Sequence, residues 1–189
     1  MIPSLTQHAH VLVAAQVQAG DTVVDGTVGN GHDTTFLCSV VGPEGRVIGI
    51  DIQATAIEFT KSVMEASQTH AELIQGCHAD VLSSMYEAGL KGVAAVMFNL
   101  GYLPGSDHAV TTRADTTIRA LACSLEMVKV GGLVTVLSYR AHDDDEEYNA
   151  VATFMTSLDP KIHYVEEVRS CNRRRSDAAP RLFVVHKIR

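Results

Sequence analysis

The chain has 189 residues and a formal net charge of −7, and it is 46% hydrophobic and 20% charged. This balance is typical of a globular domain and excludes a disordered chain, a collagen-like chain and a protein whose whole surface attracts nucleic acid. Any contact with RNA must therefore use a local basic patch. The four cysteines, Cys38, Cys77, Cys123 and Cys171, lack the short spacing of a zinc site or a redox pair, so we expect free thiols and no metal.

The N-terminal segment shows no basic region followed by an apolar stretch, and no apolar run approaches the ~18 residues of a membrane span. We therefore expect a cytoplasmic protein without membrane contact. The length predicts a single domain over residues 1–189.

Short apolar runs alternate with amphipathic stretches along the chain. We predict, in chain order, a helix over 4–18, a strand over 22–25, a helix over 32–41, a strand over 46–51, a helix over 53–68, a weaker strand over 71–75, a strand over 92–99, a helix over 113–129 that stops at Gly131 and Gly132, a strand over 133–139, a helix over 145–158, and closing strands over 162–168 and 182–188.

This alternation predicts an α/β fold with a seven-stranded, mostly parallel sheet and helices on both faces. Each of the first five strands is followed by a helix or a helical turn. The last two strands are joined by residues 169–181 without a helix, which favours an antiparallel hairpin at the sheet edge. In such sheets, ligands bind at the carboxyl ends of the strands.

The strongest local signal is the glycine-rich turn after the first strand, Asp25-Gly26-Thr27-Val28-Gly29-Asn30-Gly31-His32-Asp33-Thr34. Its glycines let the backbone approach a ligand closely. The turn lacks the third glycine of the dinucleotide fingerprint and the lysine of a phosphate-binding loop. Asp25 and Asp33 would repel a pyrophosphate and suit a cationic or amine-bearing ligand. A purely structural turn is the alternative interpretation.

Asp51 ends the second strand, 22 residues after Gly29. An acid at about this distance hydrogen-bonds the ribose hydroxyls in nucleotide-binding sheets. Together with the turn, Asp51 indicates a nucleoside ligand without phosphates, for which S-adenosylmethionine is the common example. A solvated strand-end carboxylate is the alternative.

A third signal follows the fourth strand, Phe98-Asn99-Leu100-Gly101-Tyr102-Leu103-Pro104. Asn99 can offer its amide oxygen and a neighbouring carbonyl to a substrate amine, and the aromatic ring can stack on a base. The segment resembles the Asn-Pro-Pro-Tyr segment of amino-group methyltransferases, with Leu100 and Gly101 in place of the prolines. An ordinary turn is the alternative.

Two charged runs lie in the second half of the chain. Arg173, Arg174 and Arg175 form a dense basic run, which is either a solvated hairpin tip or a set of RNA phosphate contacts. The acidic run over residues 143–147 begins a predicted helix, where carboxylates interact favourably with the helix dipole. A magnesium site at this acidic run is the less favoured interpretation.

Five segments carry a family resemblance: DGTVGNGHDT at 25–34, GIDIQATAI at 49–57, FNLGYLPGSDH at 98–108, TTRADTTIRAL at 111–121 and GGLVTVLSYRAH at 131–142. They resemble the small Rossmann-fold methyltransferases of the putative rRNA methylase family. That family is associated with methylation of 5-aminomethyl-2-thiouridine at the tRNA wobble position. The resemblance implies a class I methyltransferase fold, S-adenosylmethionine as methyl donor and a tRNA uridine amine as acceptor.

The resemblance also implies roles for individual residues. For the donor, it places Asn30 and Asp33 at the amino-acid end, with Gly29 and Gly31 supplying close backbone, Asp51 and Gln53 at the ribose and adenine, and Cys77 and His78 near the adenine, with Asp80 a weaker candidate. It places Asn99 at the methyl-transfer site, with Tyr102, Tyr139 and His142 as candidates for stacking or proton acceptance. The chain departs from the family at Ala141-His142-Asp143-Asp144, where Gly-His-Pro-Gly is usual.

Two other interpretations remain open from the sequence. One is a methyltransferase that acts on rRNA or on a small-molecule amine. The other is a non-catalytic nucleotide-binding or RNA-binding module. Either a monomer or a homodimer is compatible with the sequence.

Overall fold

The computed structural model describes residues 4–101, 111–140, 145–170 and 180–189. Its elements, in chain order, are α1 (Leu5–Gln16), β1 (Thr22–Asp25), α2 (His32–Val41), β2 (Arg46–Asp51), α3 (Ala54–Ser67), β3 (Glu72–Gln75), α4 (His78–Glu87), β4 (Val93–Asn99), α5 (Ala114–Met127), β5 (Val128–Ser138), α6 (Glu146–Ser157), β6 (His163–Val168) and β7 (Arg181–Lys187).

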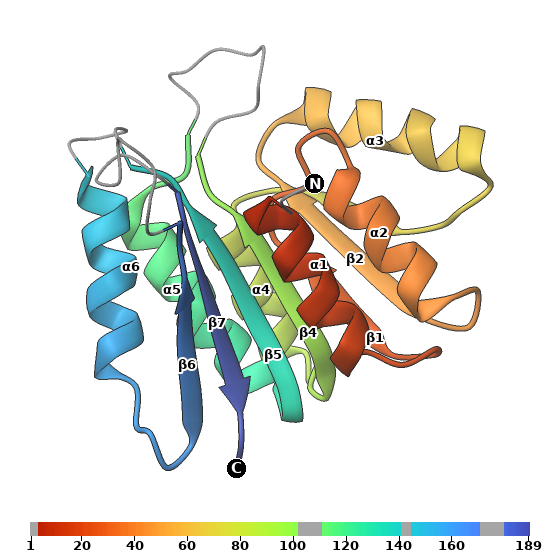
Figure 1. The fold of residues 1–189 in the computed structure, drawn as a ribbon. Coiled ribbons are helices and arrows are strands. Elements are labelled where there is room, and N and C mark those ends of the chain that lie inside the picture. Colours follow the sequence, from red (N-terminus) through yellow and green to blue (C-terminus); the bar gives the residue numbers. More distant parts are fainter. Residues whose placement is uncertain (1–3, 102–110, 141–144, 171–179) are drawn as a thin grey trace.

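One sheet joins the seven strands in the order β3-β2-β1-β4-β5-β7-β6 (Figure 1). Strands β1 to β5 run parallel, and β7 is antiparallel to both β5 and β6. The predicted mostly parallel sheet with a closing hairpin is therefore confirmed, and β7 lies inside β6. On one side of β1 lie β2 and then β3, and on its other side lies β4. This reversal of the strand order opens a crevice between the β1 and β4 exits.

Helices cover both faces of the sheet, as the alternating pattern predicted. In Figure 1, α1 and α2 lie in front of the sheet and α4 lies behind it. One core cluster joins residues of α1, α2 and α3 to the sheet, and a second joins residues of α4, α5 and α6 to its other face. Neighbouring residues of β1 divide between them, since Val23 packs in the first cluster and Val24 in the second.

The α5–β5 boundary differs from the prediction. The helix ends at Met127, and β5 begins at Val128 instead of Leu133, so Gly131 and Gly132 lie inside the strand. Val128 pairs with Val93, and the register then shifts until Leu133 pairs with Ala95. Because β5 begins directly after the helix, no glycine separates the two elements in the sequence and marks where the strand starts.

No helix within the described ranges is long and apolar enough to cross a membrane.

Candidate functional site

A cavity of about 750 Å³ opens at the carboxyl ends of β1, β2, β3 and β4. We call it the sheet-edge cavity. Nine of the residues predicted from the sequence line it: Gly29, Asn30, Asp33, Asp51, Gln53, Cys77, His78, Asn99 and Tyr139. Three separate sequence signals thus meet at one place. Tyr102, His142, Arg173, Arg174 and Arg175 lie outside the described residues.

The glycine-rich turn is shaped by two close approaches. A Cβ on Gly26 would lie 2.3 Å from Cε1 of Phe98, so the turn rests directly on the ring at the end of β4. Gly31 precedes α2 with a φ of 74°, and a Cβ there would lie 2.8 Å from the Thr60 side chain. These two glycines fix the course of the turn, and Gly29 and Asn30 line the cavity between them.

Asp51 joins the turn to the end of β2. One of its carboxylate oxygens, Oδ2, accepts a hydrogen bond from the backbone N–H of Gly29 at 2.8 Å. The other, Oδ1, accepts one from the backbone N–H of Gln53 at 2.9 Å. The half-buried carboxylate also lines the cavity, and each oxygen has a further lone pair for a ligand hydroxyl.

Asp25 lies beneath the turn and does not line the cavity. Its carboxylate is fully buried and accepts hydrogen bonds from the Thr34 hydroxyl at 2.6 Å and the Thr27 N–H at 3.1 Å. Burial, followed by the charge of Asp33, raises the pKa of Asp25 to about 7, although the two hydrogen bonds oppose the shift. Asp25 therefore supports the turn from below.

His10 contacts the cavity residue Asp33, and no sequence motif pointed to it. Its Nε2 is hydrogen-bonded to Oδ1 of Asp33 at 2.6 Å, and Asp33 is itself buried and lines the cavity. The His10 ring lies flat against Phe36, with 3.8 Å between the ring centres. Thr6, also on α1, lines the cavity. The first helix therefore takes part in the site, although no motif links it to the glycine turn.

His78 offers a hydrogen-bond acceptor to the cavity. The ring is 8% exposed and lies edge-on to Phe98. Its Nε2 is buried and has no hydrogen-bond partner among the described residues. Burial lowers the pKa of His78 and keeps the ring neutral. A ligand group that donates a hydrogen bond to Nε2 would satisfy this buried atom.

Asn99 lies opposite the glycine turn. Its backbone N–H donates to the Thr27 hydroxyl at 2.7 Å, which holds the end of β4 against the loop after β1. Two residues on, the Gly101 N–H donates to the Thr112 hydroxyl at 2.9 Å, and the Thr112 N–H donates to the Gly101 carbonyl at 3.1 Å. Thr111, Thr112, Arg113 and Thr116 line this side of the cavity and were not predicted.

Tyr139 follows β5 and is 39% exposed at the cavity. Burial, and then the charge of Asp33, raise the pKa of its phenol above the ordinary value. Tyr139 therefore stays protonated near neutral pH, which leaves it able to donate a hydrogen bond or to stack. This argues against proton acceptance, one of the two roles considered for it from the sequence.

Comparison with known proteins identifies relatives of the whole fold. Residues 47–186 match the family described as putative rRNA methylase. A tRNA (mnm(5)s(2)U34)-methyltransferase, chloroplastic, from Arabidopsis thaliana is 37% identical over 164 residues, which are 81% of this chain and 59% of the relative. The chain thus spans less than two thirds of that relative's length.

Two solved structures are similar throughout. A putative rRNA-methylase from Clostridium thermocellum is 38% identical with a TM-score of 0.92 and covers 100% of both chains. A putative methyltransferase from Streptococcus mutans, in complex with SAH (S-adenosylhomocysteine), is 27% identical with a TM-score of 0.86 and covers 99% of both. The predicted Rossmann-like methyltransferase fold is therefore confirmed, and the chain belongs to the putative rRNA methylase family.

Proposed function

We propose that this chain transfers a methyl group from S-adenosylmethionine to the aminomethyl group of 5-aminomethyl-2-thiouridine at the wobble position of tRNA. The observation that carries the proposal is the convergence of Asp51, His78 and Asn99 on the sheet-edge cavity. The family and the name of the Arabidopsis relative support the choice of substrate.

The donor half of the cavity fits a nucleoside that carries an amino acid. Asp51 lies where ribose hydroxyls bind in this class of sheet, and the unpartnered Nε2 of His78 suits the exocyclic amine of adenine. Asp33 and Asn30 lie at the other end of the glycine turn, where the buried carboxylate favours a cationic ammonium group. A pyrophosphate would be repelled by the carboxylates of Asp33 and Asp51.

The acceptor half is built by the β4 and β5 exits. The donor supplies an electrophilic methyl group on a sulfonium, so the acceptor amine must be neutral and in line with it. Asn99 can accept a hydrogen bond from that amine without a permanent charge. A carboxylate in its place would favour the unreactive ammonium form. Tyr139 can donate a hydrogen bond or stack on the base, and the exposed Arg113 lies at the rim, where RNA phosphates can approach.

Methylation of defined RNAs tests the proposal. The purified chain is incubated with labelled donor and with tRNA that carries 5-aminomethyl-2-thiouridine, with ribosomal RNA, or with a small alkylamine. Nucleosides are then analysed by mass spectrometry. We expect a gain of one methyl group on the wobble nucleoside alone. Methylation of ribosomal RNA or of the free amine would replace the proposed substrate, and donor binding without turnover would indicate a binding module.

A further inference from the structure

The start of α6 is linked to both strand exits that build the acceptor half of the sheet-edge cavity, to β4 through Thr112 and to β5 through Arg140. This turn lies outside the donor half and carries Glu147 and Tyr148, which are buried although Glu147 is charged. From the sequence, the acidic run was expected to act through the helix dipole. The contacts of Glu147 point to a more specific role.

Glu147 uses both carboxylate oxygens within the fold. Oε1 accepts a hydrogen bond from the Thr117 hydroxyl at 2.6 Å, and Oε2 accepts one from the Thr112 hydroxyl at 2.7 Å. The side chain is only 7% exposed. A buried carboxylate is tolerated when hydrogen-bond donors satisfy it, and its place in the first turn of α6 adds the favourable helix dipole.

The hydroxyl of Thr112 connects Glu147 to the end of β4. Its hydrogen is donated to Glu147, so its oxygen is left to accept the N–H of Gly101. Gly101 stands two residues after Asn99, the proposed orienting residue. The hydrogen bonds from Gly101 N–H to Thr112 and from Thr112 to Glu147 therefore run in one direction. The carboxylate at the end accepts from Thr112 with one oxygen and from Thr117 with the other.

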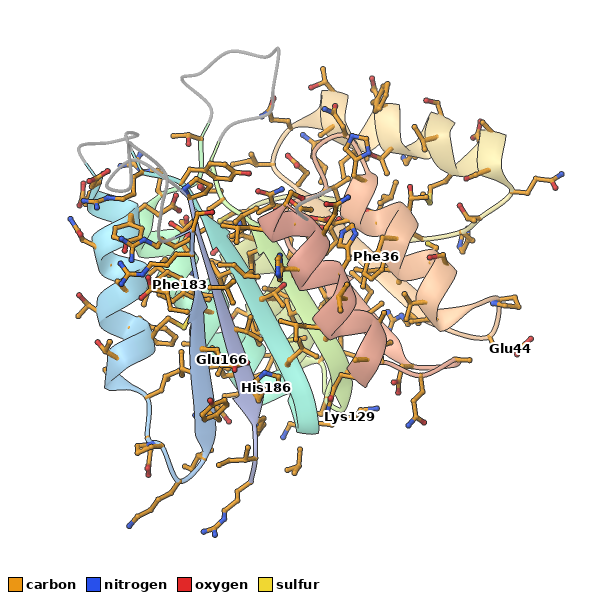
Figure 2. All side chains as sticks on the ribbon, in the orientation of Figure 1. Phe36, Glu44, Lys129, Glu166, Phe183 and His186 are labelled. Carbon is orange, nitrogen blue, oxygen red and sulfur yellow. The ribbon has the colours of Figure 1, made fainter. Side chains whose placement is uncertain are left out.

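A second set of contacts from the same turn holds the β5 exit. Arg140, next to Tyr139, donates to Oδ2 of Asp145 from Nε at 2.9 Å and from a terminal nitrogen at 2.7 Å. The Arg140 guanidinium also lies over the ring of Tyr148, 4.8 Å from its centre. Tyr148 in turn packs near Phe183 of β7, which Figure 2 shows beside α6.

We propose that Glu147 is a positioning residue that fixes the acceptor half of the site through Thr112 and Gly101, with the Arg140 contacts supporting it at Tyr139. The inference rests on the proposed function, because it assigns Glu147 to recognition of the tRNA nucleoside and leaves donor binding to the glycine turn and Asp51.

The substitution Glu147→Gln tests this assignment, because it keeps the shape of the side chain and removes one of two hydroxyl acceptors. We expect at least a tenfold loss of kcat/KM for tRNA, with less than a threefold change in the Kd of S-adenosylhomocysteine by calorimetry. The amide of Gly101 should exchange its hydrogen at least tenfold faster. Glu146→Gln removes the same charge from an exposed side chain in the same turn and should change none of these values.

A second pair of variants tests the same role if Glu147→Gln fails to fold. Thr117→Val removes the buried hydroxyl at nearly constant shape, whereas Thr117→Ser retains it; we expect the Val variant to exchange Gly101 faster and the Ser variant to resemble the wild type. Equal Gly101 exchange in Glu147→Gln and Glu146→Gln would overturn the positioning role. A wild-type chain that methylates no RNA would instead overturn the proposed function, and the exchange and Kd measurements would still decide whether Glu147 holds Gly101.

Discussion

At the scale of single residues, Asp51 serves two loops at once. Because its oxygens hold the N–H groups of Gly29 and Gln53, it both shapes the donor half of the cavity and lines it. We expect Asp51→Ala to weaken S-adenosylmethionine binding by about 1–3 kcal/mol, the range for a lost hydrogen bond to a charged group. Titration calorimetry measures this, with Glu72→Ala as control, since Glu72 pairs with Arg46 outside the cavity lining. Equal affinities of the two variants would remove Asp51 from the donor site.

Asn99 can be tested without disturbing its backbone, because its N–H is held by the Thr27 hydroxyl and not by its own side chain. We expect Asn99→Ala to lower turnover at least tenfold, about 1.4 kcal/mol of transition-state stabilisation. Donor affinity should change much less, since the amide is proposed to orient the acceptor. Single-turnover kinetics at saturating donor and tRNA give the rate. Near-native turnover would shift the orienting role to Tyr139.

Asp25 gives a pH dependence of stability. Its pKa is about 7 in the folded chain, mainly through burial, against an ordinary value of 3.8. Between these values the folded state keeps a proton that the unfolded chain releases, so the free energy of unfolding falls as the pH rises from about 4 to 7. Asp25→Asn should flatten this fall, and urea unfolding at several pH values measures it. The exposed Glu44→Gln serves as control; an unchanged slope in Asp25→Asn would contradict the raised pKa of Asp25.

Most of the donor residues proposed from the sequence line one cavity because they follow strand ends, and parallel strands bring their ends to one edge. The sequence missed His10, Thr112 and Glu147 for a physical reason. His10 meets Asp33 across 23 residues, and Thr112 meets Glu147 across 35, through packing of helices whose relative positions no local spacing encodes. His10 was one of nine histidines, and nothing in its own segment distinguished it.

At the scale of elements, the central strands were predicted closely, since β1 and β2 have the predicted bounds. The bounds of two elements were predicted less well from the sequence. No bounds were predicted for α4, because it begins three residues after β3 and its first turn contains the cavity residue His78. The start of β5 was placed too late, because Val128 pairs with β4 immediately after the helix.

The contact between the glycine turn and β4 gives a prediction at this scale. Gly26→Ala places a methyl group against the Phe98 ring, and overpacking of this kind costs about 1–3 kcal/mol. We expect a lower melting temperature in calorimetry. The double variant Gly26→Ala with Phe98→Leu should lose less stability than the two single changes summed, because the smaller side chain vacates part of the ring's space. Simple additivity would show that the turn does not rest on Phe98.

At the scale of the whole molecule, a net charge of −7 must be reconciled with the proposed RNA substrate. We expect replacement of Arg173, Arg174 and Arg175 by alanine to weaken tRNA binding while donor binding is kept. Each lost phosphate contact should flatten the salt dependence by roughly 0.7–0.9 in logarithmic slope. Binding assays over a salt series measure both effects. Arg46→Ala, at the start of β2, is the control, and an unaltered slope in the triple variant would place the tRNA on another face.

The acids around the glycine turn have a consequence for turnover under the proposed function. Asp33 and Asp51 line the cavity. The sulfonium of the donor carries a positive charge, whereas the spent cofactor is a neutral thioether. The negative charge of these carboxylates attracts the positively charged sulfonium of the donor. The neutral thioether of the product gains no such attraction. The same cluster that admits the donor therefore favours product release and limits product inhibition.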